Sequence, residues 1–585
     1  MTHPEVADGL KKVFARRGDF VVIGLTGRTG SGCTTSATLL SKEFSNLRLP
    51  TVKTDNASAE ERKYRIVHDF VERNWRPFFS LSMSNVLLSF LLDKEDVQLR
   101  DFFSQAGLLP QAAQLEGFIT SWRPAQEIWQ RSRNEIYQSN TLENKQALLT
   151  AWQGPIQDFF RTVKDGLGPA STKILQLVGD NLRKSGDPFS SNHLPDRFYE
   201  LPERAAHLIE TVVEVQRSKG EPAYIVLDAL RNPFELLYFR ERFAAFYVVA
   251  ISTPNEDRER RLSVRLSYTA KQIADMDDKE YPERNKPLAG YEAFTSQNIQ
   301  SCLEKADIYL GNPGYVPPNQ EINTSSLAAQ LIKYFALMLH PGLTTPTRSE
   351  RCMQIAFAAR ANSGCISRQV GAAITDANDS VKAVGWNDVP AGQVPCLLRR
   401  ATDLINDHDQ AAFSDYENKD SRFRERVSQS YKRYTLVDTG GRSSAFCFKT
   451  EYNTLTKQDN QVHTRSLHAE ENAFLQIVKQ GGQGIEGGKL YTTASPCELC
   501  AKKAFQLGIK NIYYIDPYPG ISLTHILKSG AAQARPTVEL FQGAVGTAYH
   551  RLYDPILPYK DELRALMEGK PEEQAPPAQP VARLL

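Results

Sequence analysis

Two short motifs near the C-terminal end of this chain place the strictest demand on its fold. They are His468-Ala-Glu470 and Pro496-Cys497-Glu-Leu-Cys500. Each motif opens a segment with helical periodicity, 468–479 and 497–507, and the segment between them, 489–493, has the composition of a strand. For the three metal-binding side chains to meet, one helix and one strand must return the chain to the same edge of a sheet.

The residue types in these motifs are those of a catalytic zinc site. One imidazole and two thiolates are ligands that zinc prefers, and a catalytic zinc keeps a fourth position for water, whose pKa falls to about 7. A helix start favours the thiolate, because the positive end of the helix dipole stabilises its charge. Glu470 is not needed as a ligand and is a candidate for moving protons. We therefore predict zinc ligands at His468, Cys497 and Cys500, and a catalytic carboxylate at Glu470.

Two simpler interpretations of these motifs remain open. A Cys-x-x-Cys pair can be a redox centre, although here the proline precedes the pair. A closed structural zinc site needs a fourth ligand, and Cys447 or His463 is available, without the spacing of a zinc finger. The order and spacing of the two motifs together are typical of zinc nucleobase deaminases.

A glycine-rich segment near the N-terminus predicts a phosphate-binding loop. The apolar run 20–25 leads into Gly27-Arg-Thr-Gly30-Ser-Gly32-Cys33-Thr34, and a helical segment follows. Glycines let backbone N–H groups converge on phosphate oxygens, and the helix N-terminus attracts anions. Thr34 occupies the position of a magnesium-binding hydroxyl, and Asp228 ends a later apolar run, where a magnesium-holding carboxylate belongs.

The lysine that usually reaches the β- and γ-phosphates is replaced by Cys33. This replacement impairs phosphate transfer more than binding, because the backbone N–H groups remain. We therefore predict that a nucleotide with Mg²⁺ binds at Gly27, Gly30, Gly32, Cys33, Thr34 and Asp228 and acts as a regulator. An active kinase and a purely structural domain are the alternatives, and a reactive thiol at Cys33 is a further possibility, since helix starts lower thiol pKa values.

The remaining pattern predicts an α/β chain with two domains. In residues 1–335, apolar strand-like runs alternate with helical segments, which is typical of a parallel sheet, and 75–217 forms a helical insertion. Residues 345–570 form a second domain, in which the polar, weakly patterned segment 400–465 is a long insertion of the kind that is functional or mobile. The tail 571–585 is expected to be disordered.

Composition excludes several classes of protein. The chain has 70 basic and 68 acidic residues, so it lacks the excess of positive charge expected of a long nucleic-acid track. It contains no run of about 18 apolar residues and no signal-peptide pattern. Eight cysteines in 585 residues are too few for a disulfide scaffold. We expect a cytoplasmic protein with no membrane partner.

Several segments upstream of the zinc motifs carry a resemblance to a known family, namely Ala358-Ala-Arg360, Ser363-Gly-Cys365, Arg368-Gln-Val-Gly-Ala-Ala373, Gly385-Trp-Asn387 and Pro390-Ala-Gly392. With these segments and the zinc motifs, the region of about 345–560 resembles the deoxycytidylate (dCMP) deaminase branch of the cytidine deaminase superfamily. This resemblance implies a C-terminal α/β/α sandwich of the cytidine deaminase type. It also implies a sugar or phosphate contact for Asn387 and suggests a phosphate contact for Arg368, for which a surface role is equally open. Some members hold a second zinc, for which Cys365, Cys396 and His463 are weak candidates beside the simpler interpretation of buried thiols.

A kinase-like P-loop domain without its lysine, followed by such a domain, resembles the bacterial antiviral dCTP deaminases. That resemblance implies conversion of free dCTP to dUTP, and of dCMP to dUMP, which depletes dCTP during phage infection. It further implies a homo-oligomer whose activity waits for a regulatory nucleotide, an RNA or a phage-derived trigger. The alternatives are a housekeeping dCMP deaminase for thymidylate synthesis, a single-stranded nucleic-acid cytosine deaminase, and a nucleotide sensor with an inactive deaminase scaffold.

Overall fold

The structure is a computed structural model. It describes residues 17–108, 112–167, 169–265, 267–280, 292–314, 323–436, 438–458, 460, 462–482, 484–516 and 522–568. The chain divides into two compact units, the first comprising Met1–Thr345 and His550–Leu585 and the second comprising Pro346–Tyr549. The tail 571–585, expected to be disordered, lies outside the described residues. No helix in the described ranges is both long and apolar enough to cross a membrane.

The first unit is built on a parallel sheet in the order β5-β4-β1-β3-β2. Its three central strands are almost completely buried, which explains their continuous apolar sequences. The edge strand β2 was not predicted, because it has four residues and only Leu81 is buried. The strands are β1 (Phe20–Thr26), β2 (Phe79–Ser82), β3 (Ala223–Asp228), β4 (Phe246–Ser252) and β5 (Ile308–Gly311).

Helices occupy the long connection between β2 and β3, as the sequence predicts. They are α4 (Met83–Ser89), α5 (Asp96–Gln105), α6 (Ala112–Gln138), α7 (Leu142–Ala151), α8 (Gln157–Leu167), α9 (Pro169–Ser185) and α10 (Glu200–Ser218). The other helices of this unit are α2 (Cys33–Leu40), α3 (Ala59–Asn74), α11 (Pro233–Arg242), α12 (Asn255–Arg260), α13 (Ala270–Glu280), α14 (Glu292–Thr295), α15 (Ile299–Glu304), α16 (Ser325–Leu339) and α25 (Tyr559–Glu568).

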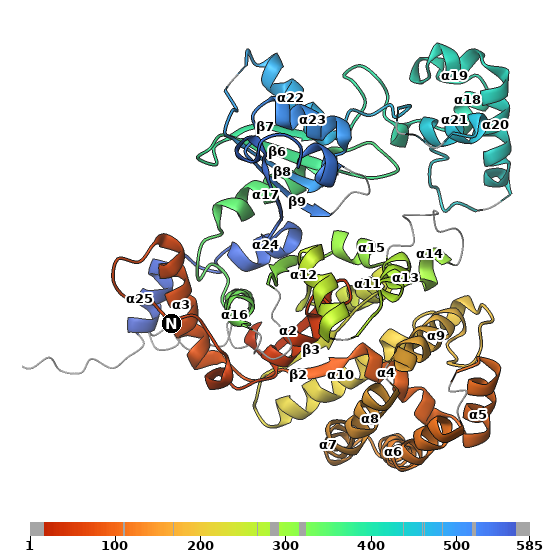
Figure 1. Ribbon diagram of the computed structural model, residues 1–585, viewed down its shortest axis with the longest axis vertical. Helices are drawn as coiled ribbons and strands as arrows, with labels where there is room; N and C mark the ends of the chain where they lie inside the picture. The colour runs from red at the N-terminus through yellow and green to blue at the C-terminus, as the bar shows by residue number, and fades with distance from the viewer. Residues whose placement is uncertain are drawn as a thin grey trace, which may run out of the picture. The chain divides into compact units, whose positions relative to one another are not determined.

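The second unit contains a mixed sheet in the order β10-β9-β8-β6-β7, in which β6 is antiparallel to both neighbours. Helices α22 and α23 share a buried core with one face of this sheet, while α17 packs against β6 on the other (Figure 1). The strands are β6 (Gly371–Thr375), β7 (Val381–Trp386), β8 (Lys489–Ala494), β9 (Asn511–Asp516) and β10 (Thr537–Leu540). The helices are α17 (Arg348–Ala359), α22 (Ala469–Lys479) and α23 (Glu498–Gln506), and α24 (Gly546–Tyr553) contains the boundary between the units.

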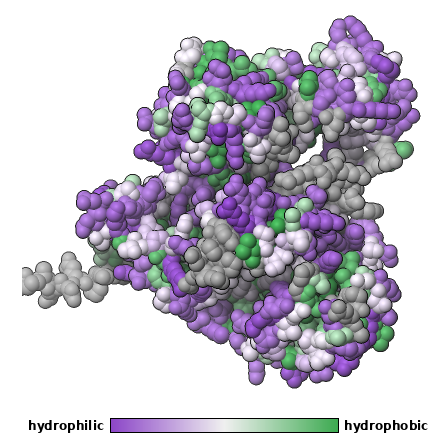
Figure 2. All heavy atoms as spheres, in the orientation of Figure 1, coloured by the Kyte–Doolittle hydropathy of each residue, from purple (hydrophilic) through white to green (hydrophobic). Residues whose placement is uncertain are grey.

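The insertion 400–465 is more regular than its polar sequence indicates. It contains α18 (Ala401–Ile405), α19 (Asp415–Lys419), α20 (Ser421–Tyr431) and α21 (Phe448–Thr456). These helices enclose a small core of their own, made mainly of Phe413, Phe423, Val427 and Phe446. Their outer face is mostly hydrophilic in the view of Figure 2, which is why the segment shows only a weak pattern.

Candidate functional site

The three predicted metal ligands meet at the start of two helices. His468 is the N-cap residue of α22, Cys497 is the N-cap residue of α23, and Cys500 lies in the first turn of α23. The Nδ1 atom of His468 lies 3.2 Å from Sγ of Cys497 and 3.6 Å from Sγ of Cys500. All three ligand atoms lie within 4.8 Å of one another. Ligand atoms around a tetrahedral zinc are about 3.5–3.8 Å apart, so this set of donors fits zinc.

No other such group of three potential ligands is found in the described part of the chain. Cys447 and His463 therefore do not join the triad as a fourth ligand, which leaves the closed structural site without support. Cys365, Cys396 and His463 are likewise not gathered into a second site. The ring of His463 instead packs against Tyr452, with the ring centres 4.5 Å apart.

The three ligand side chains of the triad shift one another's pKa values. A hydrogen bond from the Cys500 thiol, together with His468, lowers the pKa of Cys497 well below its usual range, so Cys497 is the first thiol to ionise. The hydrogen bond between His468 and Cys497 raises the pKa of His468. Glu470 is only 4% exposed, and burial raises the pKa of its carboxyl. Its Oε1 atom accepts a hydrogen bond of 3.4 Å from Oγ1 of Thr492 on β8.

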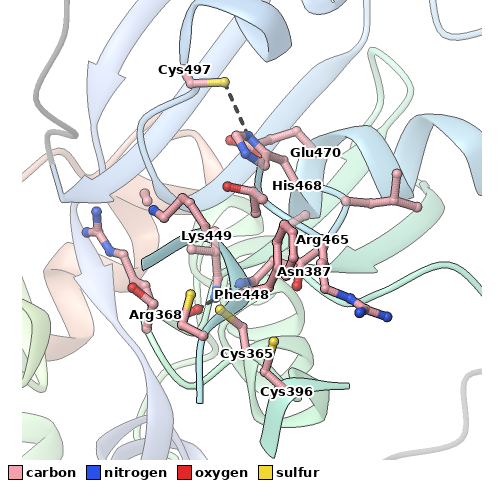
Figure 3. A pocket seen from close by; sticks show the side chains of 18 of the residues that line it. Cys365, Arg368, Asn387, Cys396, Phe448, Lys449, Arg465, His468, Glu470 and Cys497 are labelled. Atoms are coloured by element: carbon pink, nitrogen blue, oxygen red, sulfur yellow. Dashed lines mark hydrogen bonds between the residues drawn. The ribbon is translucent and has the colours of Figure 1, made fainter. Parts of the chain in front are cut away.

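A pocket opens beside the triad, and its wall includes His468, Glu470, Cys497, Asn387 and Arg368 (Figure 3). The Oδ1 atom of Asn387 accepts a hydrogen bond from the backbone N–H of Val370, and its Nδ2 atom donates to the carbonyl of Arg368, both at 2.7 Å. Asn387, the predicted substrate contact, therefore also fixes the backbone of Arg368 and Val370, which line the same pocket. The guanidinium group of Arg368 forms an ion pair with buried Asp516.

The insertion supplies pocket residues that the sequence analysis missed. Phe448 and Lys449, at the start of α21, line the pocket together with Thr464 and Arg465. No local sequence signal distinguishes these residues, because the fold of the insertion brings them to the pocket.

Gly385 sets the position of the helix that carries the site. A Cβ atom at Gly385 would lie 2.3 Å from the carbonyl oxygen of Ala469 and 2.4 Å from the backbone nitrogen of Ala473, both on α22. Because backbone atoms cannot give way as a flexible side chain can, any larger residue pushes α22 away from β7.

We therefore expect Gly385→Ala to displace His468 and Glu470, which begin α22. Overpacking of this kind costs about 1–3 kcal/mol, and a misplacement of about 1 Å can lower catalytic rates about a hundredfold. Thermal unfolding and ammonia release measure the two effects. Gly484→Ala is the matched control, because a Cβ at Gly484 meets nothing within 4 Å. Equal behaviour of the two variants would contradict this role of Gly385.

The predicted phosphate loop lies between β1 and α2 in the first unit. Gly32 has a φ of 115°, and a Cβ there would lie 2.2 Å from Nδ2 of Asn312, so only glycine fits. Oγ1 of Thr34 donates a hydrogen bond of 2.9 Å to Oδ2 of Asp228, which brings the two predicted magnesium-binding residues together. Gly27, Gly30, Gly32, Cys33 and Thr34 line a pocket of their own.

Two findings at this loop differ from sequence-based expectation. Cys33 is buried, and burial, followed by the charge of Asp228, raises the pKa of its thiol to about 12, which is the opposite of the lowered pKa expected at a helix start. The carboxylate of Glu280, at the end of α13, accepts a hydrogen bond of 3.0 Å from the backbone N–H of Thr29 and forms an ion pair of 2.9 Å with Arg231. The loop therefore already binds an anionic group of this chain, which the sequence analysis did not predict.

The sequence of the second unit is similar to proteins of a known family. The family model described as the cytidine and deoxycytidylate deaminase zinc-binding region matches residues 346–516. The deoxycytidylate deaminase of Enterobacteria phage T2 is 30% identical over 173 residues, which is 29% of this chain and 81% of that protein. The deoxycytidylate deaminase of Enterobacteria phage T4 is 30% identical over 178 residues, 29% of this chain and 79% of that protein.

A crystal structure of the dCMP deaminase from the cyanophage S-TIM5, in complex with dCMP and dUMP, matches 34% of this chain and 99% of its own, at 22% identity and a TM-score of 0.21. The family match covers both motifs of the triad and the segments upstream of them. Through its second unit, the chain belongs to the cytidine and deoxycytidylate deaminase family, whose zinc-binding domain deaminates cytosine nucleotides.

Proposed function

We propose that the second unit deaminates free deoxycytidine nucleotides by hydrolysis, converting dCTP to dUTP and dCMP to dUMP. The observation that carries this proposal is the meeting of His468, Cys497 and Cys500 beside buried Glu470 in one pocket. Zinc would be held by these three side chains. When bound, it acts as a Lewis acid that lowers the pKa of a coordinated water towards about 7.

The protein residues then account for positioning and proton transfer. Glu470 takes a proton from the attacking water and delivers it to N3 of the ring. The water oxygen bonds to C4 of cytosine and becomes a hydroxyl group there. Glu470 then moves the proton of this hydroxyl group to the exocyclic nitrogen, the bond between C4 and that nitrogen breaks, and ammonia departs. Asn387 and Arg368 line the same pocket and are the proposed contacts to the sugar and phosphate.

Ammonia release from a panel of substrates tests this function. The panel holds deoxycytidine, dCMP, dCDP, dCTP, their ribose equivalents and a cytosine-containing oligonucleotide. We expect release from dCTP and dCMP, with dUTP and dUMP as products. Turnover of dCMP alone would favour the housekeeping dCMP deaminase, and turnover of the oligonucleotide alone would favour a nucleic-acid deaminase. No turnover of any substrate would favour the nucleotide sensor.

We further propose that the glycine loop of the first unit binds a nucleotide with Mg²⁺ and regulates the deaminase. The hydrogen bond between Thr34 and Asp228 supports this, as does Oδ1 of Asp228, which is buried with no hydrogen-bond partner among the described residues. Binding of ATP, GTP or a deoxynucleotide, measured by equilibrium dialysis with and without Mg²⁺, should weaken in Thr34→Ala. Nucleotide binding that changes neither with Mg²⁺ nor with Thr34→Ala would contradict the proposed magnesium site.

Depletion of dCTP as a defence against phage is the biological role that this pairing of units favours. This role requires that the deaminase be restrained in uninfected cells. We propose that a regulatory nucleotide, an RNA or a phage-derived trigger controls it, and that the protein acts as a cytoplasmic homo-oligomer. The dCTP pool of phage-infected cells that carry the protein should fall, compared with cells that carry a Glu470→Gln variant. An unchanged pool would contradict the defensive role while leaving the chemistry intact.

A further inference from the structure

The pocket beside the zinc triad carries an excess of positive charge. Its lining includes three basic side chains besides His468, namely Arg368, Lys449 and Arg465, whereas Glu470 is the one carboxylate among the lining residues that the structure describes. Figure 3 shows Arg368 and Lys449 on one side of the view and Arg465 on the other, with Cys497 and His468 at the upper end. Because Glu470 is the proposed proton carrier beside the triad, we do not count it as a partner for the basic side chains of the pocket.

The charge of Arg368 is balanced outside the pocket lining, because it forms an ion pair with Asp516, which is 1% exposed. The other two basic side chains of the wall, Lys449 and Arg465, belong to the insertion. Lys449 lies in the first turn of α21.

Arg465 is held in the wall by a buried network. Nη1 of Arg465 lies 2.5 Å from Oε2 of Glu417, and Nη1 of Arg399 lies 2.6 Å from Oε1 of the same carboxylate. Glu417 and Arg399 have fully buried side chains. Two guanidinium groups share one carboxylate, so this network keeps one net positive charge, and its member that reaches the pocket is Arg465.

We propose that Lys449 and Arg465 bind the β- and γ-phosphates of the nucleotide, so that the insertion selects the triphosphate over the monophosphate. This inference rests on the proposed function and names the part of the substrate that its pocket recognises. A triphosphate carries about two more negative charges than a monophosphate, and charge-assisted hydrogen bonds from Arg and Lys to phosphate are the strong ones. Glu417 acts as a positioning residue, because it fixes the guanidinium group of Arg465.

Steady-state kinetics of Lys449→Gln and Arg465→Gln with dCTP, dCMP and deoxycytidine test the proposal. A lost hydrogen bond to a charged group corresponds to about tenfold in affinity. We therefore expect the KM for dCTP to rise about tenfold in each variant, the KM for dCMP to rise less, and the kcat for all three substrates to stay within about threefold. The matched control is Lys419→Gln, because Lys419 belongs to the same insertion but forms an exposed ion pair with Asp415.

Arg465→Lys separates the loss of phosphate binding from a damaged insertion. It keeps a positive charge but loses the forked geometry, so we expect it to recover part of the affinity for dCTP that Arg465→Gln loses. An unchanged KM for dCTP, or an equal rise for deoxycytidine, would overturn the inference. If the unmodified protein deaminates none of the substrates, the proposed function fails; if it does so and the variants match it, only the inference fails.

Discussion

Glu470→Gln is expected to abolish deamination while leaving the metal site intact. Glutamine preserves the volume of the side chain but cannot accept the proton that the reaction must move. One positioned acid–base group contributes about 10²–10⁴-fold to a rate, so we expect kcat with dCTP or dCMP to fall by at least about a hundredfold. Because Glu470 is not part of the triad, the zinc content should equal that of the unmodified protein.

The adjacent carboxylate provides a matched control for this prediction. Glu471 lies one residue further along the same turn of α22, where its side chain pairs with Lys503 and caps the helix. A partly exposed ion pair contributes about 0–1 kcal/mol, so Glu471→Gln should lower stability slightly and leave kcat within about threefold. Ammonia release and bound zinc are measured on both variants. Turnover by Glu470→Gln within tenfold of the unmodified protein would rule out the proton-transfer role.

The central strands around the predicted phosphate loop are visible in the sequence because they are buried on both faces. Strands β1, β3 and β4 read as continuous apolar runs for this reason. The insertion is different. Phe423 and Val427 of its core share α20, but Phe413 and Phe446 lie outside the helices, on separate segments of the chain. Its architecture therefore depends on tertiary contacts that periodicity does not reveal.

The site residues that were predicted stand in local sequence motifs, whereas those that were missed depend on tertiary contacts. His468, Cys497 and Cys500 stand in motifs whose residue types and order indicate one chemistry, and the structure brings them together. Lys449 and Arg465 stand in no motif and reach the pocket only through the fold of the insertion.

The contact of Glu280 with Thr29 spans 251 residues, and an acidic residue at the end of a helix carries no sign of such a distant partner. Long-range contacts of this kind are beyond local pattern analysis, whereas the glycine loop itself was recognisable from its spacing alone.

Cys497→Ser is expected to remove zinc and, with it, all measurable deamination. The triad joins the starts of α22 and α23, and a thiolate is a far stronger zinc ligand than a serine hydroxyl, which stays protonated at neutral pH. The unmodified protein should carry about one zinc per chain, whereas the variant should lose it on dialysis. The thermal unfolding temperature should also fall, because binding to the native state alone stabilises it.

Cys396→Ser is the control that shows whether zinc loss is specific to the cysteines of the triad. Cys396 lines the same pocket, is 6% exposed, and accepts a hydrogen bond of 3.4 Å from Nη2 of Arg399. We expect this variant to retain its zinc, because Cys396 does not belong to the triad. Loss of zinc from both variants would show that zinc binding depends on Cys396 as well as on the triad, and retention of zinc by Cys497→Ser would refute the triad. Since both substitutions remove one sulfur from one pocket, only metal binding distinguishes them.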